Sequence, residues 1–238
     1  MTIHTLRQAQ GPPVTLANFP NLRYFKNMKK YLDSIYYALL FVFFTLLVRV
    51  IDVQAVGPLE SRVGFAGLNL AVHNFFGMHI FWYKLTQVLG IAAIFVAAVF
   101  AIVGFIQLIK RKSLLKVDKD LLMLGIVYIV LILLYVLFEK VPINYRPVVL
   151  DTAEGLEPSY PSTHTMLILT IFGTAIRCAG VYIKNQKLVF TAKILCLVIM
   201  AITIVGRLVC GVHWFTDIVG GVLISLAFIS LYKNLTRV

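Results

Sequence analysis

Long apolar runs separated by short polar stretches make up most of the chain after residue 27. Six runs approach or exceed the length of about twenty residues that an α-helix needs to cross a bilayer. They cover 34–51, 85–109, 121–138, 163–183, 188–206 and 214–232. Only helices and closed barrels satisfy their backbone groups in lipid, so the pattern predicts an all-α, polytopic membrane protein with six transmembrane helices.

The segments outside these runs are polar or mixed. Residues 1–27 are polar and show no sustained periodicity, so we expect them to form a mobile cytoplasmic extension. Residues 28–238 would form one six-span domain. Within it, the stretch 63–76 mixes aromatic and aliphatic side chains with Asn69 and Asn74 and is too polar to span. We expect this stretch to form a short helix lying at the outer membrane interface.

Composition and charge narrow the class of protein further. The chain is 60% hydrophobic and 13% charged, with a mean hydropathy of +0.90, which excludes an ordinary soluble domain. The net charge of +12 could suggest nucleic-acid binding. However, sixteen of the 22 lysines and arginines fall on one side of the six-span arrangement. The positive-inside rule then places both termini on the cytoplasmic side of the membrane, which we expect to be a bacterial plasma membrane. This use of the basic residues argues against nucleic acid as a partner.

The most informative polar residues stand between the last two apolar runs. Arg207, His213 and Asp217 occur there in order. On a helix, His213 and Asp217 are four residues apart and share a face, so the carboxylate can fix the imidazole tautomer. In one sequence of this length and composition, the number of times this spacing is expected by chance is roughly 0.005. Polar groups beside membrane spans are costly and indicate a function.

Two further motifs lie between the third and fourth runs. The first contains Lys140 and Arg146, and the second contains Ser162, Thr163 and His164 where the fourth run begins. A helix that begins at the second motif would present the backbone N–H groups of these three residues as an anion site. Arg146 adds a planar guanidinium suited to phosphate oxygens. Alternatively, the two basic residues bind lipid head groups and His164 only caps a helix.

The three motifs in this order resemble the signature of the type 2 phosphatidic acid phosphatase superfamily. That superfamily includes membrane lipid phosphatases and vanadium haloperoxidases, and the similarity is greatest to bacterial six-span lipid phosphatases. The motifs cover residues 140–217, and the span pattern extends the resemblance over 28–238.

The resemblance implies a role for each matching residue. His213 would be the nucleophile that forms a phosphohistidine, with Asp217 orienting it. His164 would be the general acid that protonates the leaving oxygen. The phosphoryl oxygens would be bound by a set of basic side chains and helix N–H groups, namely Arg146, Arg207, Lys140, Ser162 and Thr163. Such a site needs no metal and no other cofactor.

The chain departs from the family pattern at three positions. Glu139 occupies the usual position of the first-motif lysine, and Lys140 follows one residue later. Thr163 replaces a usual glycine, and Gly206 replaces a usual serine. Because the shift of one residue turns a helical side chain by about 100°, we expect Glu139 to face away from the site or to pair with a basic neighbour. Lys140 would then contribute a modest attraction.

The sequence therefore predicts a membrane enzyme that hydrolyses lipid phosphates or diphosphates at the outer membrane face. Its partner is a membrane lipid phosphate, and undecaprenyl diphosphate is the first candidate substrate. Phosphatidate and phosphatidylglycerophosphate are the alternative substrates. A phosphoryl transferase remains possible, as does a non-catalytic lipid-binding or transport protein, and the sequence does not fix the oligomeric state.

Overall fold

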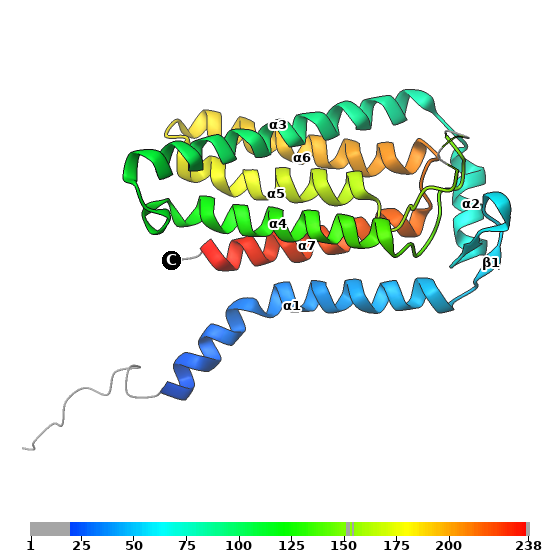
Figure 1. Ribbon diagram of the computed structural model, residues 1–238, viewed down its shortest axis with the longest axis horizontal. Helices are drawn as coiled ribbons and strands as arrows, with labels where there is room; N and C mark the ends of the chain where they lie inside the picture. The colour runs from blue at the N-terminus through cyan, green and yellow to red at the C-terminus, as the bar shows by residue number, and fades with distance from the viewer. Residues whose placement is uncertain (1–19, 151–152, 154, 237–238) are drawn as a thin grey trace, which may run out of the picture.

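The computed structural model describes residues 20–150, 153 and 155–236. It is an α-helical bundle with a small two-stranded hairpin (Figure 1). The elements in chain order are α1 (Pro20–Val50), β1 (Gln54–Ala55), η2 (Pro58–Glu60), β2 (Arg62–Val63), α2 (Ala66–Phe76), α3 (Ile80–Arg111), η3 (Leu114–Lys116), α4 (Lys119–Lys140), α5 (Thr163–Tyr182), α6 (Gln186–Val209) and α7 (Phe215–Thr236).

The six predicted spans are confirmed. Each matches one helix that is long and apolar enough to cross a membrane, and the six segments are Tyr31–Val50, Ile80–Arg111, Lys119–Lys140, Thr163–Tyr182, Gln186–Val209 and Phe215–Thr236. Helix α1 begins at Pro20, inside the segment assigned to the extension. Residues 1–19 lie outside the described part of the chain, so the mobility of the extension stays a prediction.

Helices α5 and α7 form the centre of the bundle. Their spans are 67% and 56% buried, whereas the other four are 11–22% buried. Helix α7 packs between α1 and α5, and α5 also contacts α3 and α6. The surrounding helices expose large apolar side chains such as Phe95 and Leu133, as expected for surfaces that face lipid tails. The second motif lies at the start of α5, and the third motif ends in the first turn of α7.

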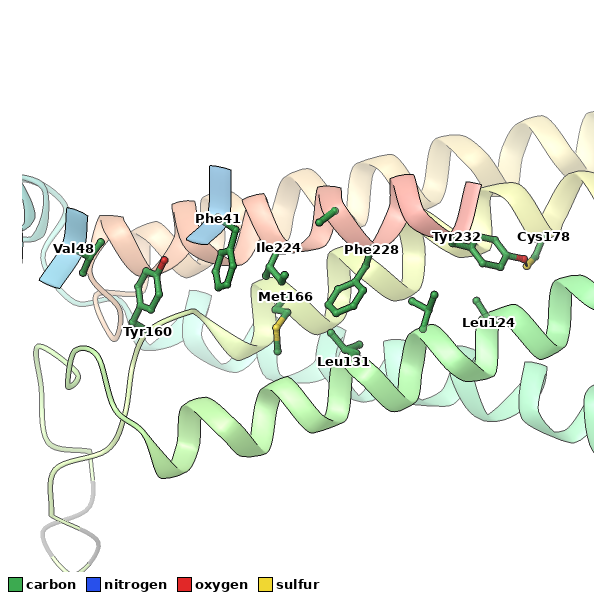
Figure 2. Close-up of a cluster of buried hydrophobic side chains, with 12 residues drawn as sticks. Phe41, Val48, Leu124, Leu131, Tyr160, Met166, Cys178, Ile224, Phe228 and Tyr232 are labelled. Carbon is green, nitrogen blue, oxygen red and sulfur yellow. Dashed lines mark hydrogen bonds between the residues drawn. The ribbon is translucent and has the colours of Figure 1, made fainter. Parts of the chain in front are cut away.

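Tyr160 anchors the second motif to the core. Its ring stacks on Phe41, with the ring centroids 6.3 Å apart (Figure 2). The Phe138 ring meets it edge-on, with the centroids 6.1 Å apart. The Tyr160 hydroxyl lies 2.8 Å from Thr45 Oγ1. A side chain at Gly220 would overlap the Tyr160 ring, so the glycine permits this close packing against α7. The start of α5 is thereby fixed against α1, α4 and α7.

Helix α2 confirms the predicted short helix between the first two spans. It lies at the end of the bundle where the three motifs gather (Figure 1). Asn69, expected at the interface, is instead fully buried. Its side chain accepts from the Thr216 N–H at 3.1 Å and donates to Thr216 Oγ1 at 3.0 Å. The helix therefore holds the start of α7 in place through an amide that satisfies buried polar groups.

Candidate active site

Backbone hydrogen bonds join the three motifs into one structure. Residues 144–146 run antiparallel to 157–159, with Ser159 N donating to Asn144 O at 2.9 Å and Arg146 N donating to Glu157 O at 3.0 Å. The indole N–H of Trp214 donates to Tyr145 O at 2.7 Å. The first motif is thus connected to both of the others.

The turn between α6 and α7 carries the third motif. Arg207 lies in the last turn of α6, and Asp217 lies in the first turn of α7. Gly211 adopts φ 73°, a conformation that glycine reaches without strain. This turn brings His213 back toward Arg207, and both side chains are buried, with 4% and 0% of their surface exposed.

The hydrogen bonds of His213 define its tautomer. Nε2 lies 2.5 Å from the Arg207 guanidinium, which can only donate. Nδ1 lies 3.2 Å from the carbonyl oxygen of Ser159, which can only accept. Nδ1 therefore carries the proton, and Nε2 has the free lone pair that a nucleophile requires.

Burial lowers the pKa of His213 well below its ordinary value. The positive charges of Arg207, Arg146 and His164 lower this pKa further. The imidazole is therefore neutral near pH 7, which is the nucleophilic form.

Asp217 acts on His213 less directly than the sequence suggested. Its Oδ2 lies 3.6 Å from His213 Nδ1, farther than the Ser159 carbonyl. The same oxygen accepts the Trp214 N–H at 2.9 Å, and Oδ1 lies 3.4 Å from the Asn144 amide. The carboxyl group therefore holds the turn around His213 and lies beside the ring. The sequence could not indicate the role of Ser159, because its contact is made by the backbone carbonyl, which every residue type has.

Arg207 has donors left for a ligand. One terminal nitrogen contacts His213, and the other donates to Thr86 Oγ1 at 3.2 Å. Its guanidinium carbon lies 5.8 Å from the centre of the Tyr83 ring, a cation–π contact. Its buried Nε has no hydrogen-bond partner among the described residues. An unpaired buried donor costs about 1–3 kcal/mol, so an anion bound here would recover that cost.

Arg146, like Arg207, has hydrogen-bond donors left for a ligand. It forms an ion pair with Glu157 at 3.0 Å, and both side chains are mostly buried. Its Nε is also buried without a partner among the residues that the structure describes. Glu157, which no sequence motif indicated, neutralises part of the charge that Arg146 was expected to offer to a phosphate.

A cavity of about 390 Å³ opens beside Arg146 and His164, whereas Arg207 and His213 are not among the residues that line it. It is lined by side chains from α3, α4, α5 and the motif loop, namely Gln87, Gly90, Ile91, Ile94, Tyr135, Glu139, Arg146, Glu157, Pro158, Thr163, His164 and Leu167. One part of the lining is charged, and another part, with Ile91, Ile94 and Leu167, is apolar. Such a lining suits a molecule with an anionic head and an apolar tail.

The first-motif side chains differ from the expectation. Glu139 lines the cavity rather than facing away, and no ion pair of Glu139 is found among the described residues. Lys140 is exposed at the end of α4 and is not among the residues that line the cavity. The reason is the shift of one residue along α4, which turns Glu139 inward and Lys140 outward.

The start of α5 also needs one correction. Ser162 is fully buried and caps the helix, accepting from Thr165 N at 3.4 Å. Its own N–H donates to Asp217 O at 2.9 Å, so this donor is not free for phosphate as predicted. Thr163 lines the cavity, as does His164. The anion site expected at this helix therefore reduces to the N–H groups of these two residues.

Helix α3 contributes contacts that the sequence did not indicate. Thr86 binds Arg207, and Gln87 hydrogen-bonds His164 Nε2 through its side-chain oxygen. Only the regular spacing of Tyr83, Thr86, Gln87 and Gly90 along one face of an otherwise apolar helix could have drawn attention to them. No group of three or more His, Cys, Asp or Glu side chains that could hold a metal occurs within the described ranges.

Comparison with known proteins agrees with this architecture. Residues 120–237 match the model of the PAP2 superfamily. This part of the chain therefore resembles the PAP2 superfamily, and the six-span fold is similar to that of a transmembrane PAP2-type phosphatase.

A solved structure shares the fold over most of the chain. It is the crystal structure of a transmembrane PAP2-type phosphatidylglycerolphosphate phosphatase from Bacillus subtilis, with a TM-score of 0.61 and 17% sequence identity. The similarity covers 84% of this chain and 94% of the other. No curated protein matches the sequence significantly.

Proposed function

We propose that this protein hydrolyses lipid phosphates through a phosphohistidine formed on His213. The observation that carries the proposal is the pairing of a buried, neutral His213 with the Arg207 guanidinium. In the free site, Arg207 covers the lone pair of Nε2. A phosphoryl group that enters would accept the guanidinium donors through its oxygens and present phosphorus to Nε2.

The arginines supply the electrostatic stabilisation. Negative charge develops on the phosphoryl oxygens in the transition state. Both Arg207 and Arg146 have a buried Nε without a hydrogen-bond partner in the described part of the chain. His164 protonates the leaving oxygen. The proposed reaction therefore uses no metal, because arginine supplies the positive charge that a metal would otherwise supply.

Lipid monophosphates fit the cavity better than diphosphates. Glu139 and Glu157 line it together with Arg146, so a second phosphate group would meet negative charge. Phosphatidylglycerophosphate is the hydrolysed lipid named for the similar Bacillus subtilis structure. Undecaprenyl diphosphate, the first candidate from the sequence, therefore ranks behind phosphatidylglycerophosphate and phosphatidate here.

Phosphate release tests this function. Purified protein in mixed micelles would receive phosphatidylglycerophosphate, phosphatidate and undecaprenyl diphosphate, with His213→Ala as the matched control. We expect release from at least one lipid that survives EDTA and stops with vanadate. Binding of all three lipids without release would instead indicate a non-catalytic lipid-binding protein. Loss of activity in EDTA, restored by a divalent ion, would contradict the metal-free reaction.

The proposed site faces the outer side of a bacterial plasma membrane, with both termini in the cytoplasm. The distribution of basic residues supports this orientation, since Lys110, Arg111, Lys112, Lys116 and Lys119 cluster at the turn between α3 and α4, at the opposite end of the bundle (Figure 1).

Cysteine labelling tests the orientation. Leu59 in η2 is 79% exposed at the site end, and Leu115 in η3 is 93% exposed at the other end. In a background without the native cysteines, an impermeant maleimide should label Leu59→Cys in intact cells and Leu115→Cys only after lysis. The reverse pattern would place the site in the cytoplasm.

A further inference from the structure

One face of α3 meets the side chain of His164. The Gln87 side-chain oxygen is hydrogen-bonded to His164 Nε2. The Gln87 amide nitrogen donates to the Tyr83 hydroxyl at 2.9 Å. The carboxamide is thus held at both ends, with its oxygen toward His164 and its nitrogen toward Tyr83.

This contact determines where the ring carries its proton. A carboxamide oxygen only accepts hydrogen bonds, so Nε2 of His164 must carry a hydrogen. In the neutral ring, Nδ1 then has the lone pair. In the charged ring, Nδ1 carries the second proton. This proton is available for transfer, because the proton on Nε2 is hydrogen-bonded to Gln87.

The orientation of the ring agrees with this assignment. A Cβ placed on Gly90 would lie 3.2 Å from Cδ2 and 3.5 Å from Nε2 of His164, so this edge of the ring packs against α3. Nδ1 is the ring atom opposite that edge and therefore faces away from α3. It has no hydrogen-bond partner among the described residues, and His164 lines the cavity.

We propose that Gln87 is a positioning residue that reserves Nδ1 of His164 for proton exchange with the substrate. The inference rests on the proposed function. In the first half-reaction, the bond from phosphorus to His213 Nε2 forms and the bond to the leaving alkoxide oxygen breaks. The proton on His164 Nδ1 moves to that oxygen.

The second half-reaction uses the same atom in reverse. Water oxygen bonds to phosphorus, the bond from phosphorus to His213 Nε2 breaks, and the water proton returns to His164 Nδ1. Gln87 keeps its hydrogen bond with Nε2 throughout and touches no reacting atom. Without it, the neutral ring would divide between two tautomers and lose its fixed orientation.

The dependence on the leaving group separates this role from a purely structural one. An alkoxide needs a proton as it leaves, whereas a nitrophenolate hardly does. The test compares the first turnover of a short-chain phosphatidate with that of a nitrophenyl phosphate carrying an alkyl chain. Gln87→Ala removes the acceptor, and Gln87→Glu retains one. Val88→Ala, on the 60% exposed neighbour, is the matched control.

General acid catalysis as a whole contributes about 10²–10⁴-fold, so we expect Gln87→Ala to slow phosphatidate turnover by roughly 10–100-fold and nitrophenyl turnover by less than about 3-fold. Gln87→Glu should keep most of the phosphatidate rate. In the nitrogen-15 spectrum, neutral His164 should be protonated at Nε2 in the wild type and divided between both nitrogens in Gln87→Ala.

Four outcomes would overturn the inference. Equal losses on both substrates in Gln87→Ala would make the residue structural, and no loss on phosphatidate would exclude any role. A Gln87→Glu variant as slow as Gln87→Ala would show that the acceptor is not what matters. A wild-type protein that releases phosphate from neither substrate would overturn the proposed function and this inference with it. The first three outcomes, in contrast, leave the proposed function intact and exclude only the role of Gln87.

Discussion

Two groups of side chains lie at the same end of the bundle but differ in how firmly their contacts fix them. The first is the buried cluster of His213, Arg207 and Ser159, here called the pocket. The second is the end of α4 with Glu139 and Lys140, here called the mouth. In the pocket, His213 is fixed from both sides, by Arg207 at 2.5 Å and by the Ser159 carbonyl at 3.2 Å. At the mouth, Glu139 and Lys140 are exposed, and neither has an ion-pair partner within the described part of the chain.

This difference follows from burial. A buried polar group must find a partner or lose about 1–3 kcal/mol, so each contact in the pocket depends on the others. An exposed charge keeps its hydration and gains at most about 1 kcal/mol from a neighbour. We therefore expect substitutions in the pocket to have large effects and substitutions at the mouth to have small ones.

The largest effect is expected at the nucleophile. His213→Ala should lower kcat by at least about 10⁴-fold, as removal of a catalytic nucleophile does elsewhere. Phosphate release from micellar lipid measures this, and an unchanged elution profile in detergent shows that the variant folds. Residual activity within tenfold of wild type would mean that another group attacks the phosphate.

Arg207→Ala comes next. Removing one preorganised donor to a developing oxyanion costs about 10²–10³-fold in rate, and Arg207 also contacts the nucleophile. We expect a loss in this range in kcat/KM. Arg207→Lys should recover part of it, because lysine supplies the charge but not the planar fork. Full activity in Arg207→Ala would remove the guanidinium from the phosphate site.

Asp217→Asn should have an intermediate effect. The asparagine oxygen can still accept the Trp214 N–H, and the Ser159 carbonyl still fixes the tautomer of His213. The ionisable carboxyl group and the second acceptor oxygen, which lies 3.4 Å from the Asn144 amide, are lost. Groups that orient a functional histidine contribute roughly 10–100-fold, and we expect kcat to fall within that range. A loss as complete as that of His213→Ala would show that the carboxylate, rather than the carbonyl, fixes the ring.

The mouth should respond least. Lys140→Ala is expected to change kcat/KM by less than about 3-fold, because exposed charges are screened. Arg146→Ala should cost more, since its guanidinium is mostly buried beside the cavity. Glu139→Lys should leave activity equal or higher, because a carboxylate in the cavity repels phosphate. If Lys140→Ala is as damaging as Arg207→Ala, the ammonium reaches the phosphate and the pocket–mouth distinction fails.

The span pattern could be predicted from sequence because lipid imposes it directly. Each apolar run of membrane length became one helix, and the six membrane-length segments end within about five residues of the expected bounds, although α1 itself begins earlier, at Pro20. The third motif could also be identified from the sequence, since polar residues next to membrane spans are costly and indicate a function. The structure places Arg207 and His213 in direct contact.

Other parts of the site carry no such mark. The Ser159 carbonyl is backbone, and Gln87 lies on a different helix, so only folding brings each to its histidine. The direction of Glu139 depends on where α4 ends, which residue types alone leave uncertain by a residue or two. Sequence therefore indicated the chemical groups, whereas the contacts that orient them required the fold.

Trapping the covalent intermediate tests the central claim most directly. Wild-type protein mixed with a radiolabelled lipid phosphate would be quenched in base within one turnover, digested and mapped by mass spectrometry. We predict phosphate on His213, stable in base and labile in acid. It should accumulate further in His164→Ala when the substrate is a nitrophenyl phosphate, because that leaving group hardly needs a proton whereas hydrolysis of the intermediate still needs His164. Phosphate on another residue, or turnover with no phosphoenzyme in either protein, would contradict the assignment of His213 as the nucleophile.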